Sequence, residues 1–192
     1  MVERASDPFF DGLVYEHLVP VVWTYLDSQP RDEQLVSAND ANTQLLRLIT
    51  SLSDRLPEQG DDNVEYNTEL ERLDLKLNVL LDIAGQLIRD QLKLPSGDPI
   101  SLGHNGLEWW VEQAPETGRL ISLKLYIDSV VSRPLQFFGV VRINDKRAVV
   151  DGRTPVRVKY MGLGRTLEDE LEKFIFRHHR KRIALERQPD KN

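Results

Sequence analysis

The sequence predicts an α+β fold, in which long N-terminal heptad helices form a coiled-coil bundle and precede a small antiparallel β-barrel with a C-terminal helix. Leucine recurs at helical spacing before Pro95, whereas β-branched and aromatic residues gather in short runs between turn signals after it. A segment with acids first and bases last closes the chain. We therefore expect a helical oligomerisation region over residues 1–94 and a barrel region over 95–192.

The composition is that of a folded protein. Of 192 residues, 40% are hydrophobic and 29% are charged, which is enough apolar material for a core. The net charge of -6 argues against a nucleic-acid partner, because phosphate binding needs clustered positive charge. The absence of cysteine excludes disulfides and thiolate metal sites and is compatible with the cytoplasm. No uncharged stretch approaches the roughly 20 residues of a membrane span, and the N-terminus lacks the apolar run of a signal peptide.

Two helices are predicted at the start of the chain. Residues 12–27 form an apolar stretch that we expect to be helical, and Pro20 either kinks this helix or starts a new one. A second helix is predicted at about 34–56. Its apolar residues follow a heptad a/d pattern in which Asn42 fills one a position, and they are Leu35, Ala38, Leu45, Ile49, Leu52 and Leu56.

The helix predicted at about 64–94 has the strongest periodicity. Its apolar residues alternate spacings of four and three over about four heptads, and they are Tyr66, Leu70, Leu73, Leu77, Leu80, Ala84, Leu87 and Leu94. Leu81, Ile83 and Ile88 widen this stripe, so three or four helices must meet around it. An intermolecular bundle is favoured. The alternative is an intramolecular hairpin in which 35–56 folds back on 66–94.

Short apolar runs predict about five or six strands in the second half. The runs are Leu107–Val111, Leu120–Ile127, Leu135–Ile143, Ala148–Val150 and Val156–Tyr160, and turn signals such as Asn105-Gly106 and Asp151-Gly152 lie between them. Residues 120–127 alternate with period two, which indicates a strand buried on one face. Of Trp109 and Trp110, which are adjacent in a strand, one points inward and the other outward.

The last predicted element is a helix that begins at Thr166 as the N-cap. Acids fill its first turns and bases its later ones, in agreement with the helix dipole. One face carries Leu167, Leu171, Phe174, Ile175 and His178, so we expect it to pack on the barrel. We interpret the basic run Arg177–Arg182 as a solvated helix end, with contact to nucleic acid or an acidic partner as the alternative.

A family resemblance emerges from two short motifs. Ile100-Ser101-Leu102-Gly103 followed by Gly106-Leu107 resembles the D/N-x-S-x-x-G loop of PilZ domains, and Met161-Gly162-Leu163 between a strand and a helix is similar to the ending of that family. A heptad helix ahead of the barrel is similar to an atypical, tetramer-forming branch. The resemblance implies a small β-barrel with a C-terminal helix, which in this family often acts as a receptor for cyclic di-GMP.

The chain departs from the family at the residues that would bind the ligand. In the family, two arginines spaced as R-x-x-x-R bind it. No R-x-x-x-R precedes Ser101, and the nearest substitute, Arg89 with Lys93, lacks the second planar guanidinium. Pro99 replaces the expected Asp or Asn. Arg153 and Arg157 have the right spacing but lie downstream, where we interpret them as a solvated strand face. The candidate nucleotide contacts are therefore Ser101, His104, Arg89 and Lys93.

No catalytic or metal constellation is present in the sequence. Its four histidines show no H-E-x-x-H spacing, and His178 and His179 are adjacent, so they diverge by about 100° on a helix. No Ser–His–Asp order or pair of catalytic carboxylates can be placed. We therefore predict no catalytic residues, no metal site and no cofactor.

Two main hypotheses follow. In the favoured one, the chain is a non-catalytic signalling adaptor of a bacterial cyclic di-GMP pathway. It forms a homo-oligomer, with a tetramer favoured, and presents its barrels to other signalling proteins. In the alternative, it is a genuine cyclic di-GMP receptor whose site is rebuilt partly from a neighbouring subunit. An enzyme of unknown type and a purely structural oligomer are the remaining hypotheses.

Overall fold

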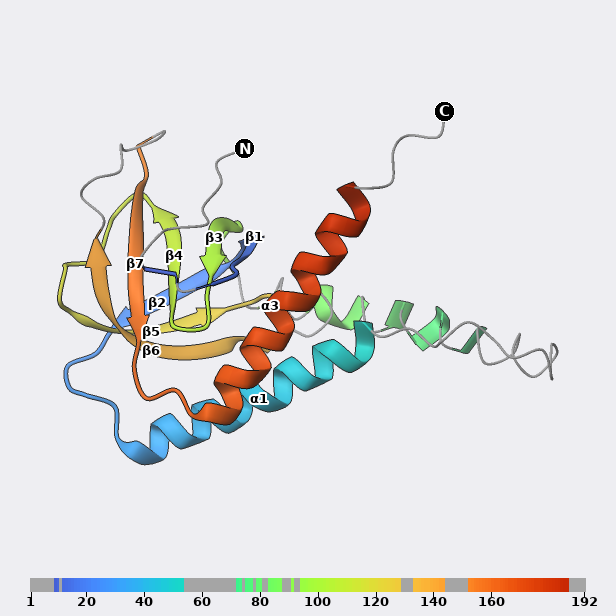
Figure 1. Ribbon diagram of the computed structural model, residues 1–192, viewed down its shortest axis with the longest axis horizontal. Coiled ribbons are helices and arrows are strands. Elements are labelled where there is room, and N and C mark those ends of the chain that lie inside the picture. Colours follow the sequence, from blue (N-terminus) through green and yellow to red (C-terminus); the bar gives the residue numbers. More distant parts are fainter. Residues whose placement is uncertain are drawn as a thin grey trace.

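The computed structural model describes residues 9–10, 12–53, 94–128, 133–143 and 152–186, together with positions 72–73, 75–77, 79–80, 83–87 and 91. In these residues a curled antiparallel sheet packs beside two helices (Figure 1). The elements are β1 (Tyr15–Val19), β2 (Val21–Tyr25), α1 (Asp32–Ser53), β3 (Asp98–Leu102), β4 (Gly106–Val111), β5 (Leu120–Leu125), β6 (Leu135–Ile143), β7 (Thr154–Tyr160) and α3 (Arg165–Glu186).

The sheet curls because its two ends are adjacent in the sequence. The strand order is β1-β3-β4-β7-β6-β5-β2, and only Pro20 separates β1 from β2. The helix predicted over residues 12–27 is therefore wrong. Proline has no N–H to donate, so the ladder with β3 ends at Val19 and a new ladder with β5 begins at Val21. β-Branched and aromatic residues around it favour strands over a kinked helix.

The prediction of an antiparallel sheet with a C-terminal helix is confirmed. Four of the predicted apolar runs correspond to β4, β5, β6 and β7, and Ala148–Val150 lies outside the described residues. Trp109 points into the core with 1% of its surface exposed, and Trp110 points outward. β1 and β2 lie in residues 12–27, which were expected to be helical. They belong to the same sheet as the strands of the barrel region.

Helix α1 exists as predicted, but its apolar stripe packs within its own chain. Leu45, Leu46 and Ile49 are buried in the same core as the sheet and α3. In the described residues α1 packs against α3 and β6, so the coiled-coil role predicted for 34–56 is not confirmed. Most of the predicted helix at 64–94 lies outside the described residues, and so does any hairpin between it and 35–56. Asn42, placed at a heptad a position by the sequence, is 1% exposed and binds the backbone of β6.

The described positions between 72 and 91 are helical, but their apolar side chains are exposed. Leu73, Leu77, Leu80 and Leu87 are 55–63% exposed, and the neighbouring residues Leu75, Val79 and Ile83 are 51–65% exposed. Ala84 is exposed as well. Tyr66 and Leu70 lie outside the described residues.

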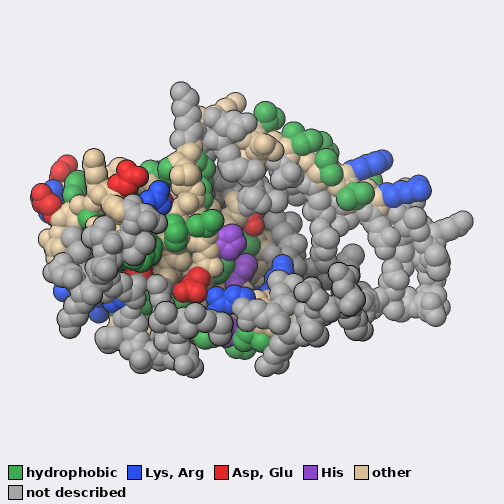
Figure 2. Space-filling model, turned by 90° about the horizontal axis from the view of Figure 1, so that it is seen from above, with side chains coloured by type: hydrophobic (Ala, Val, Ile, Leu, Met, Phe, Trp, Pro, Cys, Tyr) green, Lys and Arg blue, Asp and Glu red, His purple; other side chains and the backbone are tan. Residues whose placement is uncertain are grey.

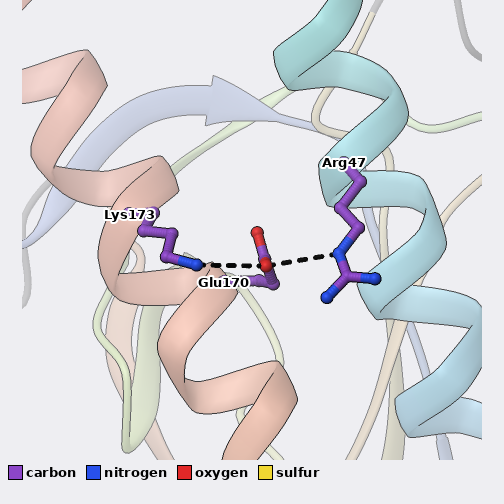
Figure 3. Close-up of polar contacts among 3 residues, drawn as sticks. All are labelled: Arg47, Glu170 and Lys173. Atoms are coloured by element: carbon purple, nitrogen blue, oxygen red, sulfur yellow. Dashed lines mark hydrogen bonds and ion pairs between the residues drawn. The ribbon is translucent and has the colours of Figure 1, made fainter.

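Helix α3 carries the predicted buried face, since Leu167, Leu171, Phe174 and Ile175 are at most 3% exposed. It begins at Arg165 rather than after a Thr166 cap, because the carbonyl of Gly164 accepts the first helical hydrogen bonds. Glu170 of α3 lies between Arg47 of α1 and Lys173 (Figure 3), at 3.2 and 3.3 Å from their nitrogen atoms. Among the described residues, no helix combines the length and apolarity required to cross a bilayer.

Candidate functional site

A polar row crosses three neighbouring strands beside the β3–β4 turn. Ser101 of β3 lies opposite Glu108 of β4, and Glu108 lies opposite Arg157 of β7. The residues that flank this row in sequence, such as Leu102 and Leu107, are in the hydrophobic core. Since side chains alternate along a strand, the polar row lies on the outer face of the sheet.

The row is buried although it lies on the outer face. Nε of Arg157 donates to Oε2 of Glu108 at 2.8 Å, and the two side chains are 11% and 1% exposed. Ser101 is 5% exposed. A charged pair removed from water persists only when both partners are well paired, so Glu108 and Arg157 depend on each other.

Two phenylalanine rings lie over the guanidinium of Arg157. The guanidinium of Arg157 lies 5.1 Å from the ring centroid of Phe9 and 5.9 Å from that of Phe10. The rings meet edge to face with centroids 4.9 Å apart. This cation–π arrangement holds the N-terminal segment over the polar row.

Glycines of the β3–β4 turn leave the space that these rings occupy. A Cβ added at Gly103 would lie 2.7 Å from a ring carbon of Phe10. A Cβ added at Gly106 would lie 2.7 Å from Phe9 and equally close to the carbonyl oxygen of Val158. The Gly-rich segment thus accommodates the chain's own aromatic rings, a role that the sequence did not indicate.

This arrangement restricts what the outer face can bind. A phosphate near Ser101 would meet the buried carboxylate of Glu108, and like charges repel strongly where water is excluded. The guanidinium of Arg157 already contacts Glu108 and both phenylalanine rings. The solvated strand face predicted for Arg157 is therefore wrong. Arg153 fits it better, because it is partly exposed and bonded to Asp98 at 3.2 Å.

Of the other candidate nucleotide contacts, only His104 lies in the described residues, and it does not join Ser101. Ser101 lies within β3 rather than in a loop, and His104 lies in the turn that follows. His104 lines a cavity of about 390 Å³ together with Gly12, Lys173 and Phe176, and Ser101 does not line it. Arg89 and Lys93 lie outside the described residues.

A second polar cluster involves the histidines of β1 and α3. The ring of His17 stacks on Tyr15 with centroids 5.6 Å apart, and His178 contacts Tyr15 at 4.8 Å and Phe174 at 4.4 Å. Burial lowers the pKa of His178, and Lys181 and His17 lower it further. Burial also raises the pKa of Tyr15 to about 12. Figure 2 shows histidine side chains near the middle of one face with Lys and Arg side chains beside them.

No group of histidine and acidic side chains in the part of the chain that the structure describes is arranged to hold a metal ion. Sequence reasoning missed Phe9, Phe10 and Glu108. The alternation of β4 and β7 would place Glu108 and Arg157 on one face, but only the pairing of these strands, which the sequence does not reveal, brings them together.

The comparisons with known proteins identify a protein family and a solved structure of similar fold. A family model described as "Atypical PilZ domain, cyclic di-GMP receptor" matches residues 45–188. A solved structure of a pathogenic protein from Xanthomonas campestris is similar at 23% identity with a TM-score of 0.65, covering 91% of each chain. That protein is described as a tetrameric PilZ domain self-assembled via an unusual helical bundle. No curated relative matches the chain.

Proposed function

Since this chain belongs to the atypical PilZ domain family, we propose that it is a non-catalytic signalling adaptor of a cyclic di-GMP pathway, acting in the bacterial cytoplasm. Its own residues close the outer face of the sheet at Ser101. Several copies assemble through the leucine-rich helix and present their barrels to other signalling proteins. The family description, which is that of a receptor and not of an enzyme, supports the non-catalytic part of this proposal.

The buried pair Glu108–Arg157 carries the proposal. A receptor for a dianionic nucleotide needs accessible cationic groups, because phosphates are held by charge-assisted hydrogen bonds. Here the arginine beside Ser101 is paired with a carboxylate and covered by Phe9 and Phe10. Opening this face would expose an anion next to the serine. These contacts favour an adaptor with a degenerate site.

The exposed leucines support assembly. Leu73, Leu77, Leu80 and Leu87 lie at heptad spacing with more than half of their surface exposed. An apolar stripe of this kind is rarely left in water by a monomer. The similar Xanthomonas protein is described as tetrameric through a helical bundle, and we propose a helical tetramer for this chain as well.

One observation favours the alternative of a genuine receptor. His104 is only partly buried and lines a cavity near the turn together with Glu172 and with Lys173, which pairs with Glu170, so the imidazole itself can donate to an anion there. In that case Ser101 and His104 would be completed by cations of a neighbouring subunit, with Arg89 and Lys93 as the candidates.

Calorimetric titration of the full chain with cyclic di-GMP separates the two functions. The adaptor proposal predicts no saturable heat up to about 100 µM nucleotide, whereas the receptor alternative predicts saturable heat with a Kd of about 1 µM, which is a binding free energy of about −8 kcal/mol. Micromolar binding that disappears in Ser101→Ala but persists in Ser122→Ala, a control serine on β5, would overturn the adaptor proposal.

A further inference from the structure

Two exposed apolar side chains from opposite ends of the sequence meet at one cavity. Leu13, just before β1, is 44% exposed, and Phe176 of α3 is 51% exposed. Both line the cavity of about 390 Å³ beside the β3–β4 turn, which His104 also lines. Single exposed apolar side chains are normal on a protein surface, whereas a group of them marks an interaction site.

The walls of this cavity are already ordered. One lining residue, Ile175, is 2% exposed and belongs to the hydrophobic core. The N–H of Gly103 donates to the carbonyl oxygen of Gly106 at 2.9 Å and closes the turn that carries His104. Gly12, which also lines the cavity, has a φ of +117°, a conformation that other residues rarely adopt. A preformed site of this kind loses little entropy when a ligand binds.

The polar side chains that line the same cavity have mixed charges. Glu172 provides a carboxylate and His104 an imidazole. The ammonium of Lys173 lies 3.3 Å from the carboxylate of Glu170, so this base is already paired. A phosphate would meet the negative charge of Glu172, which argues against a nucleotide in this cavity. The lining therefore suits a neutral group that both donates and accepts hydrogen bonds.

The ring of Phe176 offers surface for a further contact. The guanidinium of Arg180 lies 5.9 Å from the ring centroid, but about half of the phenylalanine side chain is still exposed. Arg180 itself does not line the cavity. Aromatic side chains dominate the energetics of protein interfaces, because each of them buries a large apolar area on contact.

We propose that this cavity binds a large apolar side chain of a protein partner together with the peptide groups beside it. The side chain packs against Leu13, Ile175 and Phe176. A neighbouring peptide N–H donates to the carboxylate of Glu172, and a neighbouring carbonyl accepts from the imidazole of His104. A peptide combines these features, because each of its side chains lies beside a neutral donor and a neutral acceptor. This inference rests on the adaptor proposal, since it names the surface on which the adaptor holds a partner.

The test is an NMR titration of the full chain, labelled at histidine rings and leucine methyl groups, with a capped tripeptide of glycine, phenylalanine and glycine. We expect saturable shifts at His104 and Leu13 with a Kd of about 1 mM, because one anchor supplies only part of an interface. The signals of His17 and Leu18, which do not line the cavity, should stay unchanged. Shifts that do not saturate, or that are as large with serine in place of phenylalanine, would overturn the proposal.

Variants of the apolar wall make the result specific. Leu13→Ser and Phe176→Ser each remove apolar surface from the cavity and should weaken binding of the phenylalanine tripeptide by about tenfold. Leu18→Ser removes a leucine that is 64% exposed and lies outside the cavity, so binding should be unchanged. All three side chains are exposed, so the fold should tolerate these changes, and circular dichroism spectra verify this. Equal weakening in all three variants would contradict the assigned site.

A second pair of variants tests the hydrogen bond to the peptide group. Glu172→Ala removes the charged acceptor and should weaken binding of the tripeptide by about tenfold. Asp169→Ala removes another exposed acid of α3, which does not line the cavity, and should have no effect. If Glu172→Ala binds as tightly as the wild type, the proposed recognition of a peptide group is wrong.

Titrations with cyclic di-GMP separate a failure of this proposal from a failure of the adaptor proposal. Nucleotide binding that leaves the signals of His104 and Leu13 unchanged would contradict the adaptor proposal alone. Nucleotide binding that displaces the tripeptide would overturn the cavity proposal as well. Shifts of His104 on dilution of the chain by itself would identify a second copy, and not a different protein, as the occupant of the cavity, and would likewise overturn it.

Discussion

The side-chain amide of Asn42 in α1 hydrogen-bonds the backbone of Gln136 on the edge of β6 that β7 does not reach. Its Nδ2 donates to the carbonyl oxygen of Gln136 at 2.7 Å, and the N–H of Gln136 donates to its Oδ1 at 2.9 Å. On the opposite side Gln136 pairs with Lys124 of β5, whereas the ladder between β6 and β7 begins only at Gly139. The asparagine thus satisfies a backbone edge and fixes α1 against the sheet.

Replacing Asn42 tests this role against that of a coiled-coil position. Asn42→Ala removes both hydrogen bonds to the partly buried backbone N–H and carbonyl of Gln136, so we expect a loss of about 1–3 kcal/mol in the free energy of unfolding. Asn42→Leu should destabilise as well, whereas leucine at a heptad a position would stabilise. Urea unfolding monitored by circular dichroism measures both. Asn39→Ala, which removes one hydrogen bond to the carbonyl of Gly162, is the milder control.

The buried pair under the phenylalanine rings predicts strong coupling between its members. Arg157→Gln removes the ion pair that the buried carboxylate of Glu108 makes with the guanidinium, and Glu108→Gln removes the same pair from the side of Arg157. Each change should cost about 3–5 kcal/mol, and the double variant should cost less than the sum. Arg153→Gln removes a more exposed base just before β7 and should cost at most about 1 kcal/mol. Additive losses in a urea-unfolding cycle would contradict this coupling.

The ion pairs of Glu170 predict a dependence of stability on pH. Burial would raise the pKa of Glu170, but hydrogen bonds from Lys173 and Arg47 outweigh it and hold the pKa below the ordinary 4.5. The folded state therefore binds this proton less tightly than the unfolded state, and the stabilisation is complete above the ordinary pKa. It is lost as the pH falls through the lower, folded-state pKa.

Glu170→Gln removes that contribution. Because Arg47 and Lys173 are mostly exposed, we expect a destabilisation of only about 0.5–1 kcal/mol near pH 6. The difference between the wild type and the variant should shrink below pH 4.5. Thermal unfolding as a function of pH measures it. A constant difference down to the acid limit would show that the charge of Glu170 does not stabilise the contact between α1 and α3.

The fit between Gly103 and Phe10 predicts that a single methyl group opens the outer face. Gly103→Ala places a Cβ against the ring of Phe10, so the ring must move away from Arg157. We expect faster hydrogen exchange of the Arg157 Nε–H, observed by NMR, with only a modest loss of stability. Gly118→Ala is the comparison: its Cβ would meet no atom, although its positive φ adds strain. If exchange at Arg157 is the same in both variants, Phe10 does not cover the pair.

The sequence predicted correctly those elements whose apolar pattern lies within one short segment. The apolar run Leu135–Ile143 coincides with β6, and the 3.6-residue spacing of Leu167, Leu171 and Phe174 predicted the buried face of α3. Residues 12–27 were misassigned because an apolar run interrupted by proline fits either a kinked helix or two strands. The pairing with β3 and β5, far away in sequence, decides between them.

The candidate site was harder to predict because its residues meet only through long-range pairing. Ser101 was identified from a local motif, but Glu108 and Arg157 come together across β4 and β7, and Phe9 reaches them from the N-terminus. Asn42 was mistaken for a coiled-coil position because heptad spacing alone does not show which surface a helix faces. The same pattern in 66–94 remains a prediction of assembly.

The exposed leucines at 73–87 predict that several copies of the chain assemble, and a measurement of mass in solution tests this most directly. Multi-angle light scattering over a range of concentrations should give the wild type a mass near four times the 22.1 kDa of one chain. The double variant Leu77→Asp/Leu80→Asp should give a monomer, because burying these charges in a helical interface would cost several kcal/mol. A wild type that stays monomeric at high concentration, or a variant with unchanged mass, would contradict the proposed oligomeric adaptor.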